Sequence, residues 1–492
     1  MGSRSDRETA SAASPSMRIG WPIGLLAVIA AWVGCREIQS PAARTARVEI
    51  MSARSVILMG DTLRLVAVAY DEDDKRVEGV TVTWESQDTS VIRMDSLGLV
   101  YGRAPGLTLV RAVVGRAHAA LTLMVDGTAG GWRSADWLCG IWQDMAAYCW
   151  SFPGVGGSIS IPVAVDAPPF EIVRYGPNHG CGLSAGGETY CWGRNNYGQV
   201  GDGTTIDRTT PVPVAPSLRF DSITVGALHT CAITAEGQAY CWGGGRRGQL
   251  GIGNPQERCN SMPCATSPAA VAGNHRFRTI AAGGDPRPGG PAAEGLGLTC
   301  AVTESYAAYC WGYNEFGSVG NGSRGDSEVP APVVGSQAFV AVAVGLAHAC
   351  GLDREGVVFC WGSNMVGQLG VNLPGDAEHT CSMGDTSTSC TSSPVRVVTQ
   401  DRFRAISANW VNVCATNWFG GAVCWGLNDL GQVGNGGAGP YARIPIRVLS
   451  NHTYLEVRTG LSASCGLTPE RMIECWGNGN PVPRQVPLPA GR

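Results

Sequence analysis

The sequence is poor in charged residues and has no basic tract. Of its 492 residues 15% are charged, and the formal net charge is −4 at pH 7. Binding to nucleic acid or to an anionic membrane surface needs clustered lysine and arginine, so neither is expected as a partner. After the N-terminal region no run is long and apolar enough to span a membrane, so membrane contact is expected only through an N-terminal anchor.

The motifs of common catalytic and metal sites are also missing. There is no His-Glu-x-x-His and no Cys-x-x-Cys, and the glycine-rich turns follow no βα unit that would make them phosphate loops. We therefore predict no catalytic residue, no cofactor and no metal, and a protein that is not an enzyme. An active site assembled from distant loops is the alternative.

The one long apolar run lies near the N-terminus. Arg18 precedes an apolar stretch over residues 19–34, a length typical of an export signal. Val33-Gly34-Cys35 resembles a bacterial lipobox, although Trp32 stands where Leu is usual, and Cys35 is the predicted lipid attachment residue. An ordinary signal peptide and an uncleaved anchor are the alternatives.

These features divide the N-terminal region. Met17 is an alternative start, residues 1–35 are the predicted leader and signal segment, and residues 36–46 are a linker. The protein is expected to be exported, either to the cell envelope as a lipoprotein or to the extracellular space.

Cysteine is abundant, with 19 residues of which Cys35 is the odd one. Two pairs, Cys259 with Cys264 and Cys381 with Cys390, lie in insertions. The other seven pairs are each ten residues apart: Cys139 with Cys149, Cys181 with Cys191, Cys231 with Cys241, Cys300 with Cys310, Cys350 with Cys360, Cys414 with Cys424 and Cys465 with Cys475.

The spacing of ten suits two short strands joined by a tight turn. In "HTCAITAEGQAYC", a three-residue loop with Gly237 in the left-handed region places Cys231 directly opposite Cys241. We predict nine disulfides, since an exported protein meets an oxidising compartment. Buried pairs of free thiols are the alternative.

Small and aromatic residues accompany every pair. Gly or Ala follows the first cysteine, and in the same register it faces an aromatic residue in five of the seven units. We predict that this cross-strand ring covers the small residue between stacked sheets. A tryptophan follows each second cysteine, from Trp150 to Trp476, and is expected in the core or between units.

These residues belong to a unit that occurs seven times. It reads Pro-x-x-Val, an aromatic, Gly-x-x-His-x-Cys, a hairpin, Cys-Trp-Gly and Gly-Gln-Leu/Val-Gly, which makes about four strands per unit and suits a propeller blade. We predict an all-β fold with a seven-bladed β-propeller over residues 127–492. Because the first unit has no preceding Pro-x-x-Val and the chain ends in "PVPRQVPLPAGR", the C-terminal strand is predicted to join the first blade and close the ring.

The repeated signature, as in "GLAHACGLDREGVVFCWGSNMVGQLG", resembles the regulator of chromosome condensation repeat family. The resemblance covers roughly residues 130–492 and implies a seven-bladed β-propeller, and the paired cysteines resemble the secreted bacterial members. The signature histidine survives only as His179, His229 and His348. We interpret these three as hydrogen-bonded structural residues.

Residues 47–126 form a second domain. Alternating strands such as "TLRLVAVAY" and "LTLVRAVV" predict a small β-sandwich, and "VTWESQDTSVIRMDSLGLVYGRAPG" is similar to the group-two bacterial immunoglobulin-like domain. Trp84 is its predicted core tryptophan. The acidic segment 71–75 is expected to be a solvated hairpin loop, with a calcium site as the alternative.

Function is expected from loop surfaces. Variable residues near each Gly-Gln turn predict a protein-binding rim, with ordinary exposed loop tips as the alternative. Insertions at 254–268 and 372–394 and the segment 283–295 are expected there or nearby. The rim residues are Tyr197, Arg246, Arg247, Phe316, Met365 and Leu430.

We predict a monomeric, non-enzymatic, exported binding protein that docks an unidentified protein partner. Two alternatives come from resemblance. Eukaryotic members of the repeat family exchange guanine nucleotide on a small nuclear GTPase, and a propeller-type β-lactamase inhibitor resembles this architecture, which would make the partner a secreted hydrolase.

Overall fold

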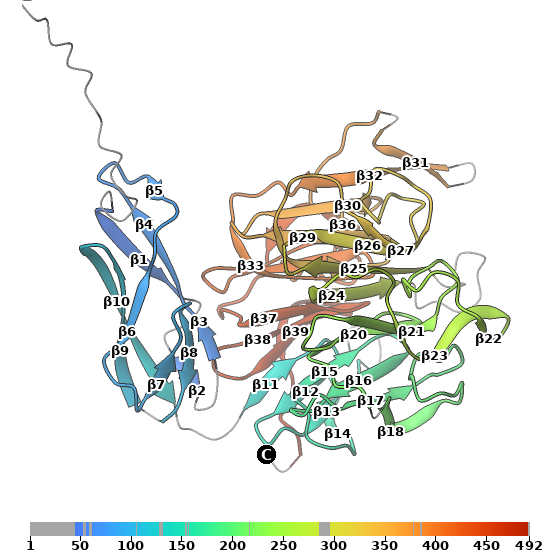
Figure 1. Ribbon diagram of the computed structural model, residues 1–492, viewed down its shortest axis with the longest axis horizontal. Coiled ribbons are helices and arrows are strands. Elements are labelled where there is room, and N and C mark those ends of the chain that lie inside the picture. Colours follow the sequence, from blue (N-terminus) through green and yellow to red (C-terminus); the bar gives the residue numbers. More distant parts are fainter. Residues whose placement is uncertain are drawn as a thin grey trace, which may run out of the picture.

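A computed structural model describes residues 45–490, with gaps at 53–55, 59–61, 105, 127–130, 153–154, 156, 216, 285–295, 377 and 384–385 (Figure 1). Every regular element within these ranges is a β-strand, so the all-β prediction is confirmed. The same ranges contain no helix of the length and hydrophobicity that crossing a membrane requires. The predicted leader with Met17 and Cys35, and nearly all of the segment 283–295, lie outside the described residues.

The N-terminal region forms three small sheets, ordered β1–β4–β5, β2–β10–β9–β6 and β3–β8–β7. Buried aliphatic residues such as Leu65, Ile92 and Val110 fill the space between them, and Trp84 packs against this core while remaining half-buried. The acidic segment 71–75 includes the turn between β4 and β5, where Asp71 Oδ1 accepts hydrogen bonds from the backbone N of Asp73 and Lys75. The strands are β1 (Arg47–Met51), β2 (Val56–Leu58), β3 (Thr62–Arg64), β4 (Val66–Tyr70), β5 (Arg76–Val77), β6 (Thr83–Ser86), β7 (Ile92–Met94), β8 (Leu99–Gly102), β9 (Gly106–Val114) and β10 (Ala117–Asp126).

The described residues from 132 onward form seven further antiparallel sheets, one for each cysteine pair ten residues apart, here called blades 1 to 7. Their first strands contact one another around the ring axis. These first strands are β11 (Trp132–Ala135), β15 (Ile172–Tyr175), β19 (Ser222–Val225), β24 (Phe277–Gly284), β28 (Phe339–Val344), β33 (Phe403–Asn409) and β37 (Glu456–Thr459).

The second and third strands of each blade form the cysteine hairpin. The second strands are β12 (Cys139–Trp142), β16 (His179–Leu183), β20 (His229–Ile233), β25 (Gly297–Thr303), β29 (His348–Asp353), β34 (Asn412–Asn417) and β38 (Ala463–Leu467). The third strands are β13 (Ala147–Cys149), β17 (Thr189–Gly193), β21 (Ala239–Gly244), β26 (Ala308–Gly312), β30 (Val358–Ser363), β35 (Ala422–Leu427) and β39 (Ile473–Gly477).

The fourth strand of each blade lies outermost. These strands are β14 (Val163–Ala164), β18 (Arg208–Val214), β23 (Met262–Ala270), β27 (Ser327–Pro332), β32 (Thr386–Arg396), β36 (Tyr441–Arg447) and β40 (Asn480–Gln485). Blades 3 and 5 carry a fifth strand, β22 (Glu257–Cys259) and β31 (Thr380–Met383).

The cysteines meet as the hairpin register predicts, and the structure joins all nine predicted pairs by disulfides. Cys259 and Cys264 have a Cα–Cα distance of 5.8 Å, and Cys381 and Cys390 one of 5.9 Å. The seven blade pairs face each other directly across the hairpin at Cα–Cα distances of 4.0–4.1 Å. These blade disulfides join Cys139 to Cys149, Cys181 to Cys191, Cys231 to Cys241, Cys300 to Cys310, Cys350 to Cys360, Cys414 to Cys424 and Cys465 to Cys475.

The blade disulfides lie inside the sheets and belong to the core. All seven first cysteines are 0% exposed. The second cysteine is partly buried in blade 1, at Cys149, and fully or almost fully buried in every other blade. In blades 2 to 7 it is 0–2% exposed, at Cys191, Cys241, Cys310, Cys360, Cys424 and Cys475. Apart from the partly exposed Cys149, these residues therefore hold the fold together and are closed to a partner at the surface.

A different ring covers the small residue after the first cysteine. Gly182 faces Tyr190 across the strands as predicted, but a Cβ on Gly182 would lie 2.4 Å from the ring of Phe170. Phe170 precedes the first strand of the blade, and its ring centre is 6.0 Å from that of Tyr190. Phe339 covers Gly351 in the same way, so the cross-strand aromatic is the second layer of this stack.

The tryptophan after the second cysteine packs between blades, as predicted. Gly201 ends the Gly-Gln turn of blade 2 with φ +79°, and a Cβ there would lie 2.5 Å from Nε1 of Trp242 in blade 3. Trp311 of blade 4 repeats the arrangement, since its Nε1 donates to the carbonyl of Gln249 in blade 3 at 3.0 Å. Each turn therefore seats the indole of the next blade.

The prediction that the C-terminal strand joins the first blade is wrong. Strand β40 pairs with β39 and completes blade 7. The reason is the place of the Pro-x-x-Val segment: "PVPV" at 211–214 lies in β18, the outer strand of the hairpin before it, and does not open the next unit. By the same rule "PVAV" at 162–165 completes blade 1 through β14, so no strand is missing there.

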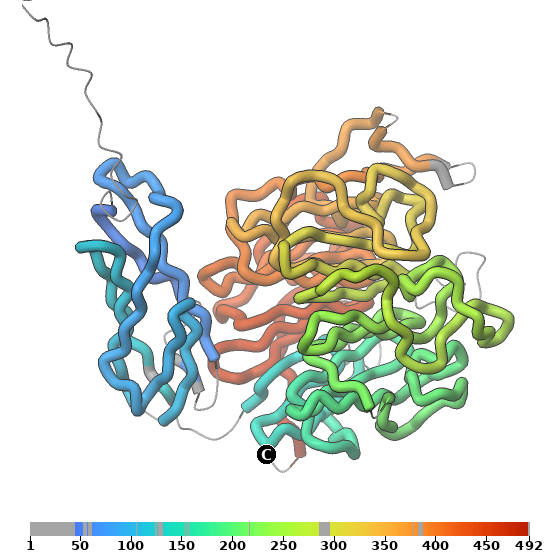
Figure 2. The backbone as a smooth tube through the Cα atoms, viewed as in Figure 1, coloured from blue at the N-terminus to red at the C-terminus, as the bar shows by residue number. Residues whose placement is uncertain are grey.

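Blades 1 and 7 close the ring through side-chain packing and hydrogen bonds. The backbone N of Trp132 donates to the carbonyl of Arg471, and that of Ala135 donates to Oε1 of Glu456, both at 2.9 Å. Figure 2 shows the cyan first blade beside the red last blade. A core cluster spans this seam and contains Trp132, Trp142, Trp150, Leu467, Ile473 and Val486.

We expect the substitution Trp132→Ala to destabilise the ring strongly. Trp132 is 1% exposed and makes edge contacts with the rings of Trp142 and Trp150 at 5.1 and 5.7 Å. Its removal should cost about 3–5 kcal/mol in free energy of unfolding, measured by guanidinium titration. The matched control Trp418→Ala removes a partly exposed indole, and an equal loss in both variants would contradict the importance of the seam.

Candidate functional site

The propeller has two faces with different connections. The loop face carries the links between third and fourth strands, at residues 193–208, 243–265, 312–327, 362–391 and 426–442 in blades 2 to 6. The hairpin face carries the turns between second and third strands, such as 184–188, 353–357 and 417–421. In Figure 1 the immunoglobulin-like strands stand on the left beside β11, β33 and β37, while β22 and β31 project on the right.

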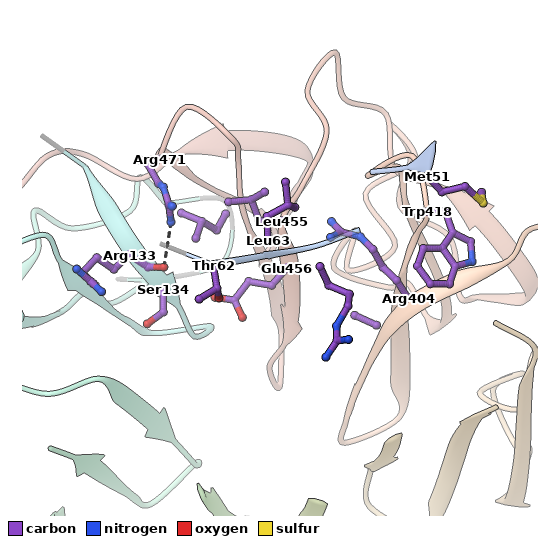
Figure 3. A pocket seen from close by; sticks show the side chains of 13 residues that line it. Met51, Thr62, Leu63, Arg133, Ser134, Arg404, Trp418, Leu455, Glu456 and Arg471 are labelled. Atoms are coloured by element: carbon purple, nitrogen blue, oxygen red, sulfur yellow. Dashed lines mark hydrogen bonds between the residues drawn. The ribbon is translucent and has the colours of Figure 1, made fainter. Parts of the chain in front are cut away.

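A cavity of about 570 Å³ separates the N-terminal region from the hairpin face (Figure 3). Strand β3 contributes Thr62 and Leu63 to it. The propeller contributes Arg404 and Trp418 from blade 6. Near the same cavity Nη1 of Arg471 donates to the carbonyl of Arg133 at 3.3 Å. The described N-terminal strands thus lie on the hairpin side, and none of them lies over the loop face (Figure 1).

Two side chains of the repeat fix the loops of the loop face, namely the asparagine two residues after Cys-Trp-Gly and the glutamine of the Gly-Gln turn. Asn195 Oδ1 accepts from the backbone N of Val200 at 2.9 Å, and its Nδ2 donates to the carbonyls of Thr204 and Ile206. Gln199 Oε1 accepts from the backbone N of Tyr197 at 2.9 Å. Equivalent bonds recur at Asn314, Asn364 and Asn428, so these signature residues build a fixed platform.

The six predicted rim residues differ in how far the structure exposes them. Arg246 and Met365 are exposed, Met365 by 51%. Tyr197 and Leu430 are half-buried beside the Gly-Gln turn, where the backbone N of each donates to the following glutamine. Phe316 is only 5% exposed, so it presents no ring to a partner.

Contacts from neighbouring blades explain the two residues that differ most from expectation. Phe316 packs in a cluster with Tyr313 and the insertion disulfide Cys381–Cys390 of the next blade. Arg247 forms ion pairs with Asp326 at 3.0 Å and Glu315 at 3.2 Å, both in blade 4. These two residues connect blades.

The two insertion hairpins are the most prominent features of the loop face. Strands β22 and β23 end in a tight turn at Asn260-Ser261, both with positive φ, and Nδ2 of Asn260 donates to the carbonyl of Asn196 in blade 2. The hairpin β31–β32 is held by Arg324 of blade 4, which donates to the carbonyls of Thr380 and Glu378. The extra cysteine pairs were the sequence signal for both.

The three signature histidines are buried between blades. His179 Nε2 lies 2.7 Å from Thr230 Oγ1 in the next blade, and His229 Nε2 lies 2.9 Å from Thr299 Oγ1. His348 differs, since Val413 holds the position of these threonines and neither ring nitrogen has a partner among the described residues. The hydrogen-bonded interpretation therefore holds for His179 and His229 but is wrong for His348.

Burial keeps these imidazoles neutral. It lowers the pKa of His179 and His348 to about 3 and that of His229 to about 4. No described group of three His, Cys, Asp or Glu residues is placed to hold a metal ion.

Family comparisons match both parts of the chain. Residues 186–233, 236–285 and 307–352 match the regulator of chromosome condensation (RCC1) repeat, and a second description of this repeat matches 172–199, 220–249 and 339–368. Residues 44–125 match the bacterial Ig-like domain (group 2). No curated protein matches the chain.

Solved propellers match the fold. Human WBSCR16 aligns with a TM-score of 0.56 and 17% identity over 69% of this chain and 89% of that one. Yeast RCC1 (Prp20), solved in complex with Kap60, aligns with a TM-score of 0.55 and 19% identity over 70% of this chain and 84% of that one. The likeness at these identities shows the propeller fold alone.

Proposed function

Since the chain carries RCC1 repeats behind a bacterial Ig-like domain, we propose that it is a non-enzymatic exported protein that docks a partner protein on the loop face. The observation that carries this proposal is the placement of two disulfide-tied hairpins, β22–β23 and β31–β32, on the face away from the Ig-like domain. The many disulfides and the Ig-like domain indicate an exported or extracellular protein.

The order of the domains supports the same orientation. An anchor at Cys35 would attach the chain ahead of the Ig-like domain, which would then act as a spacer. The loop face would point away from the attached end. A rigid platform with a few protruding side chains suits protein binding, because little conformational entropy is lost on docking.

Substitutions on the two faces test this proposal. We expect Arg246→Glu combined with Met365→Asp to weaken partner binding at least tenfold, since a charge reversal and a buried carboxylate oppose docking. Phe419→Asp, at a residue 76% exposed on the hairpin face, is the matched control. The partner is captured by crosslinking in intact envelopes, and its affinity for each purified variant is measured by biolayer interferometry.

The outcomes separate the functions. Loss of binding only in Phe419→Asp would move the interface to the hairpin face and refute the proposal. A captured hydrolase whose activity falls on binding would make the protein an inhibitor. Prp20p from Saccharomyces cerevisiae, described with its binding to Gsp1p and histones, is 17% identical to this chain, and a likeness at this level shows the fold alone.

A further inference from the structure

The centre of the propeller holds a second cavity, of about 370 Å³, lined by the first strands of blades 2 to 7 and by Asp136 of blade 1. Its wall is made largely of small or apolar residues, including Thr224, Ala281 and Ala343. The charged residues that line it are gathered on one side, from blade 6 through blade 7 and blade 1 to blade 2. They are Asp136, Arg174, Arg404 and Arg458.

The two carboxylates near these arginines, Asp136 and Glu456, already accept hydrogen bonds from the backbone. Asp136 Oδ1 accepts from the backbone N of Trp137 at 2.6 Å, and its Oδ2 accepts from the backbone N of Tyr175 at 3.4 Å. Glu456 Oε1 accepts a hydrogen bond from the backbone N of Ala135 at 2.9 Å, and its Oε2 forms an ion pair with Nη2 of Arg458 at 3.2 Å. Arg174 and Arg458 therefore lie near carboxylates that already accept other hydrogen bonds.

Arg174 and Arg458 keep donor capacity that the described residues do not use. The hydrogen bond from Arg174 goes to the carbonyl of its neighbour Val173, at 2.9 Å. Nε of Arg458 is buried with no hydrogen-bond partner within the described ranges. A buried guanidinium donor without a partner is costly, so an acceptor in the cavity would stabilise both side chains.

Electrostatics favour a negative occupant at the same place. Burial, and then the nearby positive charge of Arg458, lower the pKa of Arg174 to about 10. The same burial raises the pKa of Asp136. Two partly buried cations that line one cavity attract an anion more strongly than either would alone at an exposed surface.

We propose that this side of the central cavity binds a small oxyanion, with a carboxylate or phosphate group held by Arg174 and Arg458. The guanidinium fork matches both groups through paired N–H donors. The cavity volume lies within the range of small-molecule sites, and Ala281 and Ala343 would contact the apolar remainder of a ligand. Arg404 and Ala405 line both this cavity and the cavity beneath the Ig-like domain.

Titration calorimetry on the full exported chain tests the site with two probes, inorganic phosphate and succinate, at constant ionic strength. We expect saturable binding of at least one probe, with a dissociation constant below about 1 mM. Arg174→Met and Arg458→Lys should each weaken it at least tenfold. Arg219→Met, on the exposed hairpin face, should leave it unchanged.

A stability measurement accompanies the binding data. In chloride buffer Arg174→Met should unfold at the wild-type temperature or above it, because it removes one of two neighbouring like charges. Preference for phosphate or for succinate identifies the ligand class. No saturable heat with either probe, or equal weakening in Arg219→Met, overturns the proposal, as does a normal affinity in Arg174→Met.

Discussion

Full reduction of the disulfides is expected to unfold the propeller at 25 °C. Each of the seven blade hairpins is closed by a bridge between residues ten apart. Such a bridge contributes about 2–3 kcal/mol by restricting the unfolded chain. Seven together contribute about 14–21 kcal/mol, which equals or exceeds the roughly 5–15 kcal/mol that ordinarily separates folded from unfolded protein, so the reduced chain should not hold its blades.

Because the bridges are buried, their reduction should depend on prior unfolding of the protein. Both sulfurs of Cys231–Cys241 lie in residues that are 0% exposed, so we expect the native protein to resist dithiothreitol until guanidinium opens it. Circular dichroism and thiol counting at increasing guanidinium concentration measure both events. Refolding after dilution should succeed with the bridges intact and fail when they are reduced.

Removal of a single disulfide tests the same expectation with a matched control. Cys231→Ala with Cys241→Ala should lower the free energy of unfolding by about 3 kcal/mol or more, since a buried sulfur pair is lost along with the crosslink. Cys259→Ala with Cys264→Ala opens a protruding hairpin and should change the global transition less. If both pairs cost the same, the blade bridges have no special role in the ring.

The sequence predicted those features that depend on local spacing. Residues ten apart across a three-residue turn fall opposite each other whatever surrounds them, so the register of Cys231 and Cys241 was available from the hairpin alone. Trp242 was placed between blades because it recurs at one position of every unit. The propeller itself followed from repetition of about four short strands.

The boundary of the unit could not be obtained from repetition, because a periodic pattern has no unique starting point. We placed Pro-x-x-Val at the start of each unit, and this choice led to the wrong closure by the C-terminal strand. Proline belongs on an edge strand, where no neighbour requires its missing N–H. Pro481 and Pro483 in β40 therefore indicated an outer strand that completes its own blade.

Residues whose surroundings come from other blades were the least predictable. The hairpin β31–β32 of blade 5 buries Phe316 of blade 4, and no local pattern around Phe316 announces this. The same holds for His348, whose missing partner depends on the residue at position 413. The insertions therefore indicated where hairpins project from the ring, but the sequence did not show which of the six rim residues are exposed.

Acid is expected to destabilise the propeller steeply between pH 6.5 and pH 4. Burial lowers the pKa of His179 and His348 to about 3 and that of His229 to about 4, whereas an unfolded histidine titrates near 6.5. In this interval the unfolded chain binds more protons than the folded chain, so the free energy of unfolding falls as the pH falls. Each histidine contributes about 1.4 kcal/mol per pH unit, and three together about 4 kcal/mol.

The variant His229→Asn removes one of the three histidines that take up a proton on unfolding. Asparagine suits the position because Asn412 occupies it in blade 6, and the loss of the bond to Thr299 should cost about 1 kcal/mol at pH 8. Guanidinium titrations at pH 8 and through the interval from pH 6.5 to pH 4 should then show that the histidine contribution to the slope is about one third smaller than in the wild type. His118→Asn, in the Ig-like domain, should leave the slope unchanged. Carboxylates titrate equally in all these proteins, so an identical slope in His229→Asn and wild type would mean that the inter-blade imidazole is protonated in the folded ring.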